Sequence, residues 1–316
     1  MLETRPLGLL NVSVIGLGCN NFGKRLDQAA TSRVVAEALD SGITFFDTAD
    51  VYGETRSEEF LGRALGTRRK DVIIATKFGI KLDDRRQGGA SPTYLRSALE
   101  DSLKRLGTDY VDLYQLHRPD PAIPIAETLD ALNELVRAGK VREIGSSNFS
   151  TEQIAEADER VAEGAARFVS VQNEYNLLER SVERGVLAEL KQRKIALLPY
   201  FPLASGLLSG KYRAGVKYPE DARLVSPDFK FGDRFLNPRN LRIAAQLTTF
   251  AHARGRSLLE LSLSWLRSNR AVASIIAGAT SPEQVRQNLA ASSWPLTPEE
   301  LDEIEALAPL AGQFAA

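Results

Sequence analysis

The chain has 316 residues, of which 43% are hydrophobic and 26% are charged, an ordinary mixture for a globular protein. Its 40 Lys and Arg residues balance 41 Asp and Glu residues, whereas a surface that binds nucleic acid or an anionic membrane usually carries a basic excess, so we expect neither partner. Because Cys19 is the single cysteine and there are only two histidines, a disulfide within the chain and a thiolate zinc cluster are excluded, and we expect no metal site.

The N-terminal segment carries no sign of a targeting signal, because Met1 is followed by Leu-Glu-Thr-Arg rather than by a basic start and an apolar run. No apolar stretch approaches the roughly 20 residues that cross a bilayer. These features predict a cytoplasmic protein. Residues 2–14, with Pro-Leu-Gly near their middle, predict a β-hairpin that closes one end of the fold.

Eight apolar runs of strand character follow along the chain, separated mostly by amphipathic stretches. The predicted strands are residues 14–18, 43–46, 72–76, 111–116, 141–145, 168–172, 195–199 and 272–277, and the predicted helices between them include 31–41, 57–65, 93–106, 125–138, 151–161 and 182–193. Regular alternation of strand and helix implies a parallel sheet, since each return crossover needs a helix. Eight such units predict a (β/α)8 TIM barrel spanning residues 1–316 as one domain, with an open doubly wound sheet as the alternative.

Other segments add to this pattern. Residues 201–238 form a connection too long for a turn, and loops of that size are usually functional. Its aromatic residues would suit it to cover a cofactor or a flat substrate, or simply to pack the loop: Tyr212, Tyr218, Phe229, Phe231 and Phe235. Residues 282–291 and 298–307 predict two extra C-terminal helices. The predicted helix caps are Ser57, Ser150, Ser281 and Thr297.

Four polar side chains follow three consecutive predicted strands, at the strand ends where a β/α barrel carries its active site. Asp47 and Tyr52 come after the second strand, Lys77 after the third and His117 after the fourth. Taken singly, each residue also fits a structural role such as a turn, packing or a solvated surface. Their occurrence on adjacent units predicts that an acid, a phenol, an amine and an imidazole share one small volume.

This set of side chains is suited to proton transfer. A lysine directly after residues 73–76 would be desolvated, which is costly unless a carboxylate such as Asp47 pairs with it. The ordinary pKa of tyrosine is about 10, and a nearby ammonium lowers it by stabilising the phenolate. We therefore expect Lys77 to lower the pKa of Tyr52 and make it a general acid or base, with His117 hydrogen-bonded to the substrate oxygen.

Seven segments resemble the signature segments of the aldo-keto reductase superfamily. They are Phe-Asp-Thr-Ala-Asp-Val-Tyr-Gly at 46–53, Ala-Thr-Lys-Phe-Gly at 75–79, Gln-Leu-His-Arg-Pro at 115–119, Gly-Ser-Ser-Asn-Phe at 145–149, Val-Gln-Asn-Glu-Tyr-Asn at 171–176, Tyr-Phe-Pro-Leu-Ala-Ser-Gly at 200–206 and Gly-Ala-Thr-Ser-Pro-Glu-Gln at 278–284. They follow the family order over nearly the whole chain. The resemblance implies an NAD(P)H-dependent enzyme that reduces a small carbonyl or sugar substrate to an alcohol.

The resemblance also implies a role for each site residue. Tyr52 would be the proton donor, Lys77 and Asp47 would tune its pKa, and His117 would orient the carbonyl. NADP(H) would bind in an extended form without a Rossmann fold. Its implied contacts are Cys19 and Asn20 at the mouth, Ser147, Asn148 and Gln172 at the nicotinamide amide, Tyr200 stacked on the ring, Phe201, Pro202, Leu203, Ser205, Gly206, Gly210 and Lys211 around the pyrophosphate, and Gly278, Thr280, Gln284, Gln287 and Asn288 at the adenosine end. Small residues at 203–206 would let backbone amides approach phosphate oxygens.

Two positions depart from the family pattern. Relatives that strongly prefer the 2′-phosphate often carry Lys or Arg near position 279 or 280, where this chain has Ala and Thr. Arg223 in the long connection, or Arg286, would supply that cation instead, so we expect NADP(H), with NAD(H) as the alternative. Phe201 stands where relatives commonly have Ser, a change that bears on the loop rather than on the chemistry.

Two further functions stay open at this point. The same four side chains would serve an NAD(P)+-dependent sugar or alcohol dehydrogenase. A cofactor sensor or channel-associated regulatory subunit could use the same barrel without turnover, although the intact set of four argues for an enzyme. The sequence carries no signal for the oligomeric state.

Overall fold

Eight parallel strands form the centre of the molecule. The computed structural model describes residues 2–81, 88–212, 216, 218, 223–226, 229 and 232–310, so Phe231 lies outside the described residues. The strands are β3 (Ile15–Gly18), β4 (Phe45–Asp47), β5 (Ile73–Phe78), β6 (Val111–Leu116), β7 (Val141–Ser147), β8 (Phe168–Glu174), β9 (Ala196–Tyr200) and β10 (Ile275–Gly278). Each overlaps one of the eight predicted strands.

The sheet curls round until its two edges meet. Its strands pair in the order β10-β3-β4-β5-β6-β7-β8-β9, all in parallel. At the closing edge, the amide of Leu197 donates to the carbonyl of Ala271 at 2.7 Å, and the amide of Ala273 donates to the carbonyl of Leu197 at 3.0 Å. The predicted TIM barrel is confirmed, and the doubly wound alternative is excluded.

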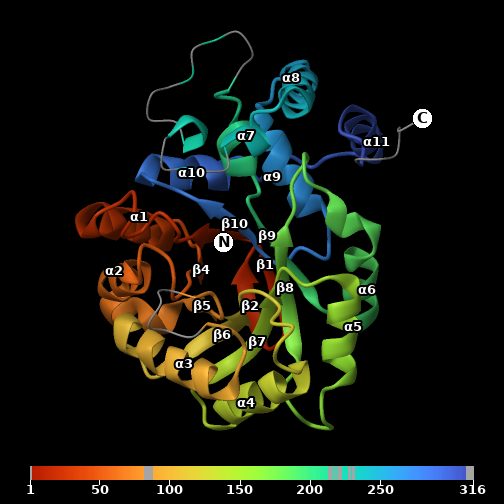
Figure 1. The fold of residues 1–316 in the computed structure, drawn as a ribbon. Helices are drawn as coiled ribbons and strands as arrows, with labels where there is room; N and C mark the ends of the chain where they lie inside the picture. Colours follow the sequence, from red (N-terminus) through yellow and green to blue (C-terminus); the bar gives the residue numbers. More distant parts are fainter. Residues whose placement is uncertain are drawn as a thin grey trace.

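Helices surround this barrel on the outside (Figure 1). They are α1 (Gln28–Asp40), α2 (Arg56–Leu65), α3 (Pro92–Leu106), α4 (Ile125–Arg137), α5 (Thr151–Glu159), α6 (Val186–Arg193), α8 (Pro238–His252), α9 (Leu258–Ser268), α10 (Pro282–Ala290) and α11 (Pro298–Leu307). The long connection after β9 contains the short elements η3 (Ala204–Ser209), η4 (Arg223–Val225) and α7 (Gly232–Phe235). The predicted helix at 182–193 is wrong in one respect: the non-helical backbone of Gly185 divides it into η2 (Ser181–Arg184) and α6.

The predicted N-terminal hairpin is present and closes one end of the barrel. Strands β1 (Thr4–Leu7) and β2 (Leu10–Ser13) pair antiparallel, and they lie in the middle of the ring of helices (Figure 1). Leu7, Leu10 and Val12 are buried in one cluster with barrel residues such as Phe45 and Leu113. Side chains therefore fill the amino-terminal end of the barrel, and the opposite end is left for a site.

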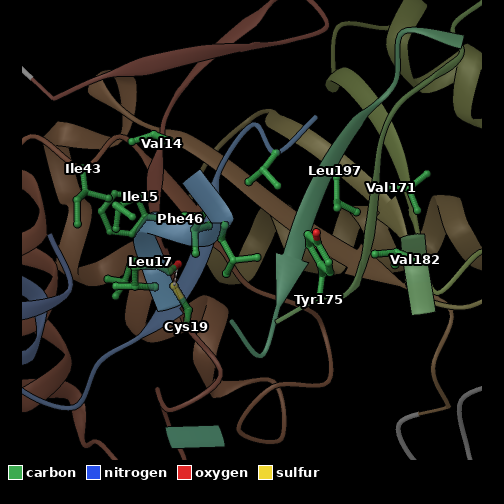
Figure 2. Packing of buried hydrophobic residues seen from close by; sticks show 14 of the residues in the cluster. Val14, Ile15, Leu17, Cys19, Ile43, Phe46, Val171, Tyr175, Val182 and Leu197 are labelled. Atoms are coloured by element: carbon green, nitrogen blue, oxygen red, sulfur yellow. Dashed lines mark hydrogen bonds between the residues drawn. The ribbon is translucent and has the colours of Figure 1, made fainter. Parts of the chain in front are cut away.

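A second apolar layer lies between strands and helices, and Figure 2 shows part of it around Ile15, Leu17, Phe46 and Leu197. Leu95, Leu99, Leu103 and Leu106 recur at helical spacing, and all four are buried on α3. Burying a leucine side chain contributes about 1.5–3 kcal/mol. The packing is close: a Cβ added to Gly62 on α2 would lie 2.3 Å from the carbonyl oxygen of Leu106.

Three of the four predicted helix caps are present in the structure. Ser150, Ser281 and Thr297 each accept a hydrogen bond from the first turn of the helix that follows, as predicted. Ser57 does not cap α2, because it is fully buried and its hydroxyl donates to the carbonyl of Cys19 at 2.8 Å. Within the described residues, no helix has the length and apolar character needed to span a membrane.

Candidate active site

A cavity of about 610 Å³ opens at the carboxyl ends of the strands, and most of the predicted site residues line it. Those lining residues are Cys19, Asn20, Asp47, Tyr52, His117, Ser147, Asn148, Gln172, Tyr200, Phe201, Pro202, Leu203, Ser205, Gly206, Lys211, Arg223, Gly278, Thr280, Gln284, Gln287 and Asn288. Lys77 is fully buried and reaches the cavity only through its partners. Gly210 lies outside the lining, at the C-terminal end of η3.

The structure brings the four predicted proton-transfer residues together. The Nζ of Lys77 lies 2.7 Å from Oδ2 of Asp47, 2.8 Å from the carbonyl oxygen of Thr48 and 3.3 Å from the hydroxyl of Tyr52. The rings of Tyr52 and His117 meet edge to face with centroids 5.9 Å apart. Strands β4, β5 and β6 are neighbours, so the ends of three consecutive units deliver these side chains to one place.

The protonation state of Tyr52 differs from the sequence expectation. Burial raises its pKa, Asp47 adds to this rise, and Lys77 opposes it without reversing it, so the pKa lies above the ordinary value of 10.0. The expected lowering is therefore wrong in sign, because spacing alone does not show how deeply the phenol is buried. At neutral pH Tyr52 holds its proton, the state that a general acid needs before it acts.

Lys77 remains charged despite its burial. Desolvation lowers the pKa of its ammonium, but Asp47 and Tyr52 outweigh this and hold the pKa above its ordinary value. Asp47 is itself held on its other oxygen, Oδ1, by the side-chain amides of Gln172 at 2.8 Å and Gln115 at 3.3 Å. The phenol therefore faces a fixed positive charge rather than a neutral amine.

His117 is neutral at ordinary pH. Burial, with Lys77 and Arg118, lowers the pKa of its imidazole to about 2. Its Nδ1 is buried without a hydrogen-bond partner among the described residues. A buried polar atom without a partner is uncommon, and beside a cavity it is a candidate contact for a bound molecule. A neutral imidazole can donate one hydrogen bond to a carbonyl oxygen.

The residues expected at the nicotinamide amide form their own network. The amide of Asn148 donates to the carbonyl of His117 and to Oγ of Ser147, each at 3.0 Å, and its oxygen accepts from the hydroxyl of Tyr200 at 2.8 Å. Ser147 in turn donates to the carbonyl of Gln172 at 2.8 Å. Asn148 has a left-handed backbone (φ 62°), which asparagine tolerates better than most residues. The network orients these side chains along one wall.

The loop after β9 fits an anion, but through a side-chain hydroxyl more than through the backbone amides that the sequence suggested. The backbone amides of Ala204 and Gly206 donate to the carbonyls of Phe201 and Leu203, each at 2.8 Å, so these two amides are not available to a phosphate oxygen. The hydroxyl of Ser205 is buried beside the cavity with no partner among the described residues. Such a hydroxyl can donate to a phosphate oxygen. The fit to a phosphate group therefore rests on Ser205 more than on those two amides.

The two candidate cations for a 2′-phosphate have different surroundings. The guanidinium of Arg223 lies between aromatic rings, 4.9 Å from the centroid of Phe229 and 5.7 Å from that of Phe201. Burial, with Arg25 nearby, lowers its pKa, and it makes no ion pair with any residue that the structure describes. Arg286 is exposed, lies outside the lining and is paired with Glu37 and Glu283. Of the two, Arg223 is the cation at the cavity.

The cavity also contains residues that the sequence did not single out for it: Gly18, Asn21, Arg25, Arg118, Ser209, Arg234, Leu259 and Ile276. Arg118 had a signal, because it directly follows the predicted site residue His117. No sequence signal pointed to Arg25 or Arg234. They lie in a loop and in a short helix, and neither segment has a hydrophobic periodicity that predicts its position.

Comparisons with known proteins agree with this geometry. A model described as the Aldo/keto reductase family matches residues 14–309. A probable voltage-gated potassium channel subunit beta from Oryza sativa subsp. japonica is 37% identical over 308 residues, covering 94% of this chain and 93% of that protein. L-glyceraldehyde 3-phosphate reductase of Escherichia coli O157:H7 is 35% identical over 309 residues, covering 94% and 89%. The structure of a glycerol dehydrogenase from Gluconobacter oxydans aligns with a TM-score of 0.82 at 30% identity, covering 99% of each chain.

Proposed function

Because the chain belongs to the aldo-keto reductase family and is an NAD(P)H-dependent oxidoreductase, we propose that it reduces an aldehyde or ketone to an alcohol with NADPH and that Tyr52 supplies the proton. The observation that carries the proposal is the half-buried phenol of Tyr52, which lines the cavity with its hydroxyl 3.3 Å from the ammonium of the fully buried Lys77. A protonated Tyr52 can act as the general acid of reduction, and the same group would accept the proton in the reverse direction.

In the proposed reduction, each of the four side chains has its own role. When bound, a nicotinamide cofactor would supply the hydride that the carbonyl carbon accepts. Tyr52 gives its proton to the carbonyl oxygen, so that the C=O group becomes CH–OH and a phenolate remains. The ammonium of Lys77 stabilises that phenolate, and Asp47 keeps the ammonium charged. His117, being neutral, donates a hydrogen bond that holds the carbonyl oxygen near the phenol.

The preference for NADPH rests on Arg223. A half-buried guanidinium with no carboxylate partner among the described residues is only partly solvated, and a bound anion would compensate its charge. A 2′-phosphate is such an anion, and NADH lacks it. Ser205 and Lys211 in the same wall suit the pyrophosphate, and Thr280, Gln284 and Asn288 suit the adenosine.

The Tyr52→Phe variant tests the proton donor. We expect turnover of NADPH with an aldehyde to fall by about 10² to 10⁴, the usual contribution of general acid catalysis, while the Kd for NADPH changes less than twofold. The control is Tyr110→Phe, a surface tyrosine that lies over Arg69 away from the cavity. A Tyr52→Phe enzyme that keeps its turnover removes Tyr52 from the step.

The same assay separates the two remaining functions. A protein that binds NADPH tightly yet never oxidises it, with a broad panel of aldehydes, ketones and sugars, would be a regulatory subunit, as the name of the rice relative suggests for that protein. A protein that works only in the oxidative direction would be a dehydrogenase, as named for the Gluconobacter relative.

A further inference from the structure

Arg118 stands out among the residues that line the cavity. Strand β6 ends at Leu116, and His117 and then Arg118 follow it. The side chain of Arg118 is exposed and lines the same cavity as Tyr52. It forms no ion pair with a carboxylate among the residues described. The nearby carboxylate Asp120 is used otherwise, since it accepts from the amides of Ala90 and Ala122 at 2.9 and 3.0 Å.

A second arginine lines the same cavity. Arg234, on α7, donates to Oε2 of Glu174 at 2.6 Å, which fixes its guanidinium at the cavity. Both arginines act on the hydroxyl of Tyr200: burial and Glu174 raise its pKa to about 12, while Arg234 and Arg118 lower it. Arg118 comes two residues after β6, and Arg234 is bonded to Glu174 at the end of β8. Tyr200, which ends β9, is bonded to Asn148 just after β7.

Arg118 lies away from the groups that suit the cofactor phosphates. In the closed order of eight strands, β6 is four strands away from β10 and therefore lies across the mouth from it, and it is three strands away from β9. Gly278 ends β10, Thr280 and Gln284 follow it, and Ser205 follows β9. An anion held by Arg118 would thus sit on the side of Tyr52 and His117, where a carbonyl substrate must lie.

We propose that Arg118 binds a phosphate or carboxylate on the carbonyl substrate, so that the preferred substrate is an anionic aldehyde or ketone. The inference rests on the proposed function, because it uses the same cavity and the same catalytic residues. Glu174 already neutralises Arg234, so of these two arginines Arg118 carries the uncompensated charge and Arg234 is a second donor. The planar guanidinium can meet either anion with two parallel hydrogen bonds. An exposed arginine that merely stays solvated would show none of the following effects.

Matched substrates test this directly. We would measure kcat and KM with NADPH for succinic semialdehyde against butanal, and for glycolaldehyde phosphate against glycolaldehyde. The variants are Arg118→Ala, Arg118→Lys and the control Arg270→Ala, which alters another exposed arginine outside the cavity. The two pairs separate a carboxylate from a phosphate as the preferred anion.

The native enzyme should favour the charged member of at least one pair by about tenfold or more in kcat/KM, which corresponds to about 1.4 kcal/mol. Arg118→Ala should abolish that preference by raising the KM of the charged member far more than that of the neutral member, while Arg118→Lys should retain part of the preference and Arg270→Ala all of it. The KM of the charged member should also rise with ionic strength, since Arg118 is exposed. Equal losses on charged and neutral substrates, or no preference in the native enzyme, overturn the proposal.

A binding measurement keeps this proposal distinct from the proposed reaction. Succinate and inorganic phosphate would be titrated calorimetrically into protein saturated with NADP+, with native protein and Arg118→Ala side by side. If no substrate turns over but anion binding is present and is lost in Arg118→Ala, the reductase function fails and the anion site stands. If both proteins bind the anions alike, or neither does, the anion site fails whatever the turnover.

Discussion

The Nζ of Lys77 and Oδ2 of Asp47 lie 2.7 Å apart, with only 0% and 4% of the two side chains exposed. Two glutamine amides complete the shell of the carboxylate. A buried ion pair with these extra hydrogen bonds is tolerable, but the removal of one partner leaves a charge buried without compensation. The same pair that holds the phenol of Tyr52 in place is therefore a source of stability that can be measured separately from activity.

Lys77→Met should lower the free energy of unfolding by about 3–5 kcal/mol, because Asp47 stays behind as an unpaired buried charge. Turnover should fall as well, because nothing then stabilises the phenolate of Tyr52. Urea denaturation and steady-state kinetics measure the two effects. The double variant Asp47→Asn/Lys77→Met should recover most of the stability yet remain slow. A double variant as unstable as the single one would mean that the two groups are not coupled.

Strand positions were readable because buried parallel strands are apolar on both faces, as at residues 73–75 and 197–198. The site followed from the fold, since residues just after consecutive strands must meet at one end of a barrel. Asp47, Tyr52 and His117 were found in this way without any knowledge of distances.

Two of the errors have a common cause, which is depth of burial. Ser57 has the sequence position of a helix cap, but the approach of β3 and β4 draws its hydroxyl inward to Cys19 and Thr48. Tyr52 was expected to be acidified by Lys77, yet desolvation outweighs the ammonium. Arg234 reaches the cavity from the long connection, and no local pattern in the sequence predicts where such a loop folds back.

Arg223→Ala should weaken NADPH by roughly 10- to 100-fold, the range expected for a lost hydrogen bond to a charged group, and change the Kd for NADH by less than threefold. The physical reason is that only NADPH carries the 2′-phosphate that a guanidinium between Phe201 and Phe229 could meet. Quenching of protein fluorescence by each cofactor measures both Kd values. Arg286→Ala is the control, because that arginine is already paired with Glu37 and Glu283. Equal losses for both cofactors would separate Arg223 from the 2′-phosphate.

Asp50 is a second buried carboxyl close to the site, and it forms no ion pair with any residue that the structure describes. Its Oδ1 is buried without a hydrogen-bond partner among the described residues, and its Oδ2 lies 3.5 Å from the hydroxyl of Tyr94. Burial and the neighbouring Glu58 raise its pKa from 3.8 to about 7, while Arg105, the amide of Val51 and Lys77 oppose the rise. The folded protein therefore binds this proton more tightly than the unfolded chain does.

Between pH 4 and pH 7 the unfolded chain loses the Asp50 proton first, so stability falls as pH rises through this window. At about 1.4 kcal/mol for each pKa unit, the full loss above pH 7 is roughly 4 kcal/mol. The side chain at position 50 of the Asp50→Asn variant cannot ionise, so this variant lacks the loss of stability. The difference in free energy of unfolding, variant minus native chain, should therefore increase by roughly 2–3 kcal/mol from pH 5 to pH 8. Urea denaturation at several pH values measures this, with Asp302→Asn as an exposed control. A constant difference between the native chain and Asp50→Asn across that range would place the folded pKa of Asp50 near its ordinary value.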